Sequence, residues 1–455
     1  MNKKKKTKKK KKHIFTIHEF LFDFISIVLV MGIAVYFGYR SLYFYSKQNL
    51  KKVHDAETLN GIILQNNSVV SSGDGLYQDS NEYFFRGNVK NNYVLLGNNL
   101  FRIIRIAGDQ SVRIVSEDYI ASFPWGDEVQ YQGSNVHLWL EKGEKEHSGI
   151  YYNIIPNITK YFQKTSYTED ILADNHIVNG EDKYSDYVGL LTIRDYIAAN
   201  GKNSFLNTGD LFFLLGYTKE QDNLYVLEDG SVKSCDSSDG FGIRPVLTLK
   251  GNTSISSGDG TETNPYRLAF DEDNLLSGRY VKLGNDMWRV YMEDGNVLRL
   301  HLNGFIQENG NNVLLPYSNT NSVFSVSDKK NIGYYLNTIY LNQLNYGTML
   351  LDCPSYIGEI SDDQGYNYLN IYQNVVHSKV TLLNVFDPIV SSELASYYYV
   401  NTTSIVGSME YDRFSSGLLK ESDVREEKPI VPVVCIAKEG IKMGKGTILD
   451  PYIVE

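Results

Sequence analysis

The longest run of apolar positions in the chain lies close to its N-terminus. Residues 20–39, FLFDFISIVLVMGIAVYFGY, contain Asp23 as their only charge, and an aromatic stretch extends the run to residue 45. About 20 apolar residues are needed to span the hydrocarbon core of a bilayer. The pattern therefore predicts a transmembrane helix over residues 20–45, with an aromatic belt at its outer end.

Beyond this segment the pattern changes to short β-type runs separated by turn residues. In the clearest stretch, YVKL (280–283), MWRVYM (287–292) and NVLRLHL (296–302) are separated by Gly-Asn-Asp and Glu-Asp-Gly, which is typical of β-hairpins. A helix is predicted after Thr192, which has the capping-box spacing to Asp195. The strand–helix alternation of a parallel sheet is absent. The body is therefore predicted to be α+β, with antiparallel sheets.

The body repeats itself at an interval of about 187 residues. NYVLLGNNLFRIIRI (92–106) aligns with RYVKLGNDMWRVYME (279–293), and three further pairs follow in the same order. Those pairs are 188–196 with 380–388, 242–249 with 429–436, and 254–268 with 440–454. Four matches in one order at nearly one spacing indicate a duplicated domain. We place the first repeat at 83–268 and the second at 269–455.

The segments on either side of the apolar run predict its orientation. Nine of the first twelve residues are Lys, in an arm over 1–19, against four basic residues between Arg40 and Lys52. Because such an excess faces the cytoplasm, the arm is predicted inside the cell and the body outside it, on a single-pass anchor. A cleaved signal peptide is the main alternative, although it needs a shorter apolar run and a small-residue cleavage site. Residues 46–82 fit either a stalk that lifts the body off the membrane or a first helix packed on the body.

Charge and cysteine content restrict the classes of partner. The chain carries a net charge of −10; residues 1–52 carry +11, which leaves −21 for the rest. Phosphate contacts need clustered Lys and Arg, so the body is not expected to bind nucleic acid. Three cysteines are too few for a disulfide scaffold or a four-cysteine zinc site. No nucleotide-binding, metalloprotease or nucleophile-elbow motif is present, and no cofactor or metal is expected.

Four side chains are candidates for ligand binding. Arg102 and Arg244 are charges within apolar runs, and Trp139 and Trp288 are aromatic groups in a chain with 35 Tyr and abundant Asn, a composition that suits sugar recognition. The structural alternative is that each arginine pairs with a carboxylate inside the fold. Val431 stands where the first repeat has Arg244, which indicates that the first repeat is specialised.

Two cysteines are candidates for a disulfide. Cys353 and Cys435 both fall in the second repeat, which on the predicted topology lies where disulfides persist. They pair only if their Cα atoms approach to about 4.4–6.8 Å, a distance that the sequence does not give. Cys235 is alone in the first repeat and is predicted to be a free thiol.

The repeated segments also carry a resemblance to known proteins. YFFRGNVKNNYVLLGNNLFRIIRI, VGLLTIRDY, GIRPVLTL and the GDGT-x-x-NPY joint resemble uncharacterised surface proteins of Gram-positive bacteria, which join a lysine-rich signal anchor to one or two copies of a domain of unknown function. The resemblance covers 60–455 and is strongest in 83–268; the second repeat departs from it at Pro388 and Val431. More distantly, the G-L-L-T-x-x-D-Y helix and G-x-R-P strand are similar to C-type-lectin-like domains of the formylglycine-generating type. That similarity implies a fold only, because the cysteines of formylglycine chemistry have no counterparts here.

Three functions are compatible with these features. The first is non-catalytic binding or adhesion at the cell surface, with a glycan, another envelope component or a surface protein as partner; duplication behind an anchor would add avidity. The second is an extracytoplasmic enzyme acting on envelope polymers, and the third is a purely structural envelope protein. We expect the first, because no motif places a nucleophile beside a base or assembles metal ligands.

The predicted topology can be tested on intact cells. Protease added outside should degrade the body and leave the anchor and lysine arm, because only residues beyond about 46 are exposed to it. Immunoblotting with antibodies to each end measures the outcome, and permeabilised cells serve as the control. Full protection of the body in intact cells would reverse the predicted orientation.

Overall fold

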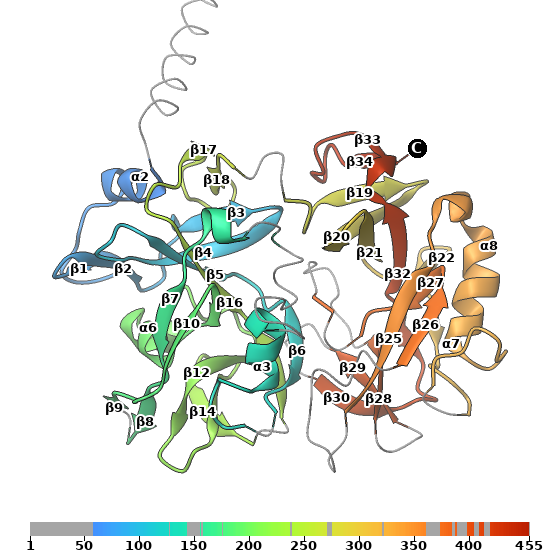
Figure 1. Ribbon diagram of the computed structural model, residues 1–455, viewed down its shortest axis with the longest axis horizontal. Helices are drawn as coiled ribbons and strands as arrows, with labels where there is room; N and C mark the ends of the chain where they lie inside the picture. The colour runs from blue at the N-terminus through green and yellow to red at the C-terminus, as the bar shows by residue number, and fades with distance from the viewer. Residues whose placement is uncertain are drawn as a thin grey trace, which may run out of the picture. The chain divides into compact units, whose positions relative to one another are not determined.

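The structure is a computed structural model of a mostly β protein with a few short helices, and it has the predicted α+β character (Figure 1). It describes residues 58–454 except 127, 143–154, 156–157, 175, 237–238, 271–274, 321–322, 361–373, 385–386, 389–397, 405–408 and 414–418. These residues belong to one compact unit, Glu57–Glu455. The predicted arm 1–19 and transmembrane helix 20–45 lie outside the described residues. Within the described ranges, no helix has both the length and the apolarity to cross a bilayer.

The first repeat is built on a sheet with the strand order β11-β16-β5-β4-β3-β18-β17. Its neighbouring strands pair antiparallel except β18 and β3, which are parallel. The bounds are β3 Tyr93–Leu96, β4 Asn99–Ile106, β5 Val112–Ser116, β11 Val188–Leu190, β16 Pro245–Leu249, β17 Ile255–Ser257 and β18 Tyr266–Leu268. The parallel pair brings the last part of the repeat beside its first central strand.

The second repeat contains a sheet with the corresponding order, β27-β32-β21-β20-β19-β34-β33. Its only parallel pair among the described strands is again the corresponding one, β19 with β34. The bounds are β19 Tyr280–Leu283, β20 Asp286–Asp294, β21 Val297–Leu302, β27 Val380–Leu382, β32 Pro432–Ala437, β33 Ile441–Met443 and β34 Tyr452–Val454. Each strand that falls in an aligned segment occupies the position of the strand with which its sequence aligns. The boundaries 83–268 and 269–455 stay a prediction.

Equivalent turns have the same backbone geometry in both sheets. Gly258 and Gly444 have φ of +100° and +94°, and a Cβ on either would lie 2.1 Å from the carbonyl oxygen of the proline seven residues later. Only glycine fits such a turn. The carbonyl two residues on accepts from the backbone N–H of Tyr93 in one repeat and Tyr280 in the other. The glycines of the joint are therefore required by the fold.

A second sheet accompanies the main sheet in each repeat. In the first repeat its order is β14-β13-β12-β15-β6, and in the second it is β26-β25-β28-β29-β30. The bounds are β6 Ala121–Pro124, β12 Phe212–Thr218, β13 Asn223–Val226, β14 Val232–Cys235, β15 Gly240–Ile243, β25 Cys353–Ile360, β26 Asn374–Ser378, β28 Tyr398–Ser404, β29 Met409–Arg413 and β30 Leu419–Asp423. Helix α6, Ile193–Ala198, begins where the sequence predicts, because the Thr192 hydroxyl accepts from the backbone N–H of Asp195.

Shorter elements connect these sheets. They are α3 Asn135–His137, α5 Ile158–Tyr161, β7 Thr165–Thr168, β8 Ile171–Ala173, β9 His176–Val178, β10 Lys183–Asp186, β22 Gln307–Glu308, β23 Asn311–Asn312, β24 Leu314–Leu315, α7 Ile332–Tyr334, α8 Leu341–Gln343 and β31 Lys428–Pro429.

Residues 58–82 belong to the folded unit. Helix α2, Leu59–Asn66, buries Leu59 and Ile63, and the Asn60 amide donates to two backbone carbonyls of the body. The hairpin of β1 Gly75–Asp79 and β2 Glu82–Arg86 joins the main sheet through β4. The stalk interpretation of 46–82 is therefore wrong for its described part, because the apolar face of the helix packs on the body.

A disulfide joins the two sheets of the second repeat. Cys353 in β25 and Cys435 in β32 are bonded, with their Cα atoms 5.3 Å apart. Cys235, at the end of β14, is buried and unbonded to another cysteine. A covalent link across 82 positions of sequence restricts the unfolded chain, which stabilises the fold.

Thiol counting tests this assignment. The denatured chain should show one reactive thiol without reductant and three with it, and Cys235→Ala should remove the first. Cys353→Ala should lower the free energy of unfolding by about 2–4 kcal/mol, because the unfolded chain regains the freedom of the closed loop. Chemical denaturation measures this change. Three reactive thiols without reductant would reject the disulfide.

Candidate functional site

A pocket of about 740 Å³ opens in the first repeat beside the start of β3, the middle of β4 and the end of β5. Its size lies in the range of small-molecule sites, about 300–1,000 Å³. Its wall contains the predicted candidate Arg102 and the segment that follows α6. The lining residues are Asp74, Asn88, Lys90, Tyr93, Arg102, Glu117, Asp118, Asn200, Lys202, Asn203, Ser204, Phe205, Asn207 and Thr208.

Arg102 is almost fully buried in the pocket wall, and its guanidinium is fixed from every side. The guanidinium carbon lies 3.8 Å from the ring centre of Tyr93, its cross-strand neighbour, and 4.8 Å from that of Phe205. Nε and Nη2 both donate to Oδ1 of Asn92, at 2.8 and 2.6 Å, and Nη2 also donates to the carbonyl of Val89. Two aromatic faces and these acceptors hold the side chain in a single position.

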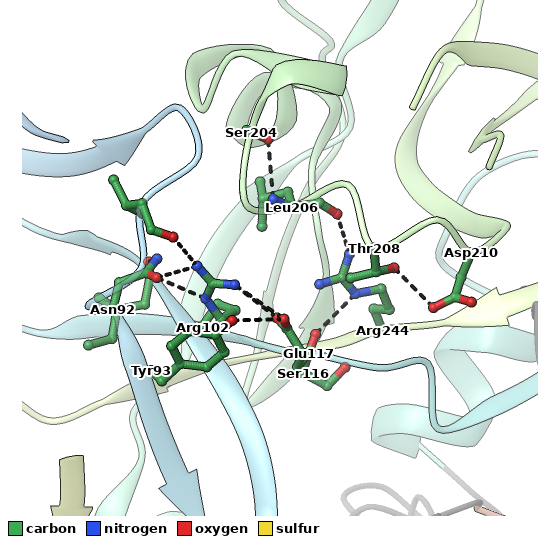
Figure 2. A network of polar contacts seen from close by, with 12 residues as sticks. Asn92, Tyr93, Arg102, Ser116, Glu117, Ser204, Leu206, Thr208, Asp210 and Arg244 are labelled. Atoms are coloured by element: carbon green, nitrogen blue, oxygen red, sulfur yellow. Dashed lines mark hydrogen bonds and ion pairs between the residues drawn. The ribbon is translucent and has the colours of Figure 1, made fainter. Parts of the chain in front are cut away.

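Glu117 pairs with Arg102 and lies near the second candidate, Arg244, whose charge also acts on its carboxylate. Nη1 of Arg102 donates to Glu117 Oε1 at 3.2 Å (Figure 2). Arg244 directly precedes β16 and is fully buried; Nε donates to the carbonyl of Ser116 at 3.0 Å and Nη1 to that of Leu206 at 2.6 Å. Figure 2 shows the two guanidinium groups on either side of the Glu117 carboxylate. Nη2 of Arg244 has no hydrogen-bond partner among the described residues.

Carboxyl groups with raised pKa values surround this linkage. Desolvation raises the pKa of Glu117, and the charges of Arg102 and Arg244 oppose that shift. Desolvation and the neighbouring Asp210 raise the pKa of Asp118, and desolvation likewise raises that of Asp210. Desolvation also lowers the pKa of Arg244, against the effect of the carboxylates. The site therefore combines fixed cations with carboxylates that accept hydrogen bonds or hold a proton.

The second repeat keeps one part of this arrangement and lacks the rest. Arg289 stacks on its cross-strand neighbour Tyr280 at 4.3 Å, as Arg102 does on Tyr93. The position of Glu117 is occupied by Asn303; their backbone N–H groups bond the carbonyls of the aligned residues Leu100 and Met287. By the same strand register, Val431 replaces Arg244 and Arg279 replaces Asn92. The polar linkage is thus specific to the first repeat.

The two tryptophan candidates lie elsewhere. Trp139 and Trp288 are both fully buried, Trp139 against the ring of Phe123 and Trp288 within the hydrophobic core of the second repeat. Because neither presents a face to solvent, we leave them out of the site. Asp195 pairs with Arg105 and Arg113.

Several pocket residues were not among the sequence candidates. Glu117 and Asp118 follow the buried strand β5, and a charge at such a strand end is the signal that could have found them. Apart from the high Asn content of the chain, nothing in the sequence marked the asparagines of the segment after α6 as pocket residues.

Comparisons with protein-family models, with curated proteins and with solved structures found no match to this chain.

Removing the shared carboxylate tests how far the linkage stabilises the fold. Glu117→Gln should lower the free energy of unfolding by about 2–3 kcal/mol, because Arg102 and Arg244 lose their counter-charge; the usual cost of about 3–5 kcal/mol is reduced by the partial exposure of Glu117. Glu82→Gln, which breaks the exposed pair with Arg105, is the matched control and should cost less than about 1 kcal/mol. Equal costs in denaturant titrations would contradict a buried linkage.

Proposed function

We propose that the first repeat binds a neutral, hydroxyl-rich ligand, a glycan of the cell envelope, in the pocket around Arg102 and Glu117. The observation that carries the proposal is the pocket lining, which is rich in hydrogen-bonding side chains and balanced in charge. The acidic lining residues are Asp74, Glu117 and Asp118, and the basic ones are Lys90, Arg102 and Lys202. A balanced polar wall favours a neutral polar ligand over an anionic polymer.

The buried linkage prepares the pocket for such a ligand. Arg102 and the Tyr93 hydroxyl both bond Glu117, so its carboxylate is oriented before a ligand arrives. A preordered acceptor costs less side-chain entropy on binding. The amides of Asn88 and Asn203 add groups that both donate and accept, as sugar hydroxyls require. Tyr93 and Phe205 already hold the guanidinium and are buried, so this mode of binding relies on hydrogen bonds more than on ring stacking.

The proposed setting is the outer face of a cell membrane. It rests on the lysine-rich arm and the apolar run 20–45, which predict a single-pass anchor with a cytoplasmic N-terminus. We also propose one such site per chain, because the second repeat has Asn303 and Val431 at the decisive positions. Avidity through two like copies of this pocket is accordingly not part of the proposal.

An enzyme acting on envelope polymers is the second candidate, and the raised pKa values of Glu117, Asp118 and Asp210 favour it. A carboxyl group with a raised pKa can serve as a general acid beside an ionised partner. Glycoside hydrolases use such pairs of carboxyl groups. Binding without turnover separates the first proposal from this one.

Binding by the full chain to neutral envelope glycans tests the proposal. Asp118→Asn and Asn203→Ala should each weaken binding by about fivefold or more, because the first replaces a charged carboxylate acceptor with a neutral amide and the second removes a hydrogen-bonding amide, and neither touches the buried linkage. Asp174→Asn, an equivalent change at an exposed pair with Lys219, should leave affinity unchanged. Glycan-array and calorimetric titrations measure the effect.

Two outcomes would overturn the proposal. One is equal affinity of all three variants and the parent chain. The other is turnover of the glycan that Asp118→Asn abolishes while binding persists, which would establish the enzyme instead.

A further inference from the structure

An apolar tip projects from the second repeat at the end of β33 and in the loop that leads to β34. The tip loop, residues 442–449, exposes Leu449 to 94%, Met443 to 57% and Ile448 to 55%. Within the described part of the chain, no other large hydrophobic side chain is as exposed as Leu449. Such a side chain makes almost no contact with its own protein, so intramolecular packing does not explain it.

The first repeat shows that the fold does not require these residues. Its equivalent loop closes with the same bonds: the N–H of Asp259 donates to the carbonyl of Asn264, as that of Lys445 donates to Asp450. Ser256, Ser257, Asp259, Glu262 and Thr263 stand there in place of Lys442, Met443, Lys445, Ile448 and Leu449. Polar and acidic residues thus support this turn equally well. The geometry of the turn therefore does not explain the change to apolar and basic residues.

The two kinds of replacement together identify the partner. Apolar side chains that project from a convex tip suit a surface they can enter, and the interfacial zone of a bilayer is such a surface. Lys442 and Lys445 beside them complement anionic headgroups, in a body that otherwise carries a large negative charge. A second protein or a second copy would need roughly 800 Å² of matched surface on each side, far more than three projecting side chains provide.

We infer that the tip loop docks on an anionic lipid surface, with Met443, Ile448 and Leu449 in the interfacial zone and Lys442 and Lys445 against the headgroups. This docking is independent of the glycan pocket, since it uses the second repeat and none of the pocket residues. Docking also accounts for the apolar and basic residues by which this loop differs from its equivalent in the first repeat.

The test places a fluorescent probe at the tip of the full chain. Leu449→Trp introduces an indole into a chain whose three tryptophans are all fully buried, so the new emission reports on the loop. The chain is reconstituted in vesicles of phosphatidylglycerol mixed with phosphatidylcholine, or of phosphatidylcholine alone, each with brominated acyl chains as quencher. Quenching of the new emission is expected in the anionic vesicles and should fall severalfold in the neutral ones.

The matched control carries the same Trp probe at position 449, in a tip loop that is given two residues of the equivalent loop of the first repeat. Adding Lys445→Asp and Ile448→Glu to Leu449→Trp should weaken docking about tenfold, since a cation is replaced by an anion next to the headgroups. Any anchor in residues 1–57 is present in both chains, so the difference reports the loop alone. Equal quenching of the two chains, or equal quenching in both vesicle types, overturns the inference. So does a blue shift that depends on protein concentration without lipid, which would assign the tip to self-association.

Discussion

A guanidinium buried against the main sheet needs its charge met inside the protein, and the pocket follows from that constraint. An unpaired charge in this setting costs several kcal/mol. The guanidinium of Arg102 therefore bonds Asn92, the carbonyl of Val89 and Glu117, and it stacks between two rings. Glu117 in turn faces Arg244, which fixes the segment around Leu206 through its carbonyl. The groups that compensate the charge are thus also those that hold the pocket wall in place.

The repeat in the sequence anticipated that the same strands recur in both copies, but it gave neither their order nor the parallel pair, and the pocket was not accessible in the same way. Aligned segments became strands at equal positions, and the Thr192 cap began the expected helix, because both depend on local spacing. Arg102 and Arg244 were singled out as charges in apolar surroundings, but Glu117 joins them only through the register of β4, β5 and β16. The two tryptophan candidates are buried, which composition could not show because it does not reveal which aromatic faces are covered.

The two repeats show how one scaffold separates structural residues from residues free to change. The stacked Tyr–Arg pair and the glycine turn persist in both copies. Glu117 and Arg244 give way to Asn303 and Val431, and the joint loop changes from acidic to apolar and basic. Packing and turn geometry tolerate these exchanges, so the copies differ in surface and pocket chemistry while the order of their strands is the same.

The parallel pairing of β18 with β3, and of β34 with β19, has a consequence for how such a chain grows. In each repeat, the last strand lies parallel beside the first of the strands that both repeats share. Because the two strands run parallel, the chain enters a copy at one end of this pair and leaves it at the other, so copies can follow one another in tandem without any strand being rethreaded. In this architecture the number of copies is a variable that recombination can alter, and each added copy supplies a fresh surface on which substitutions can accumulate.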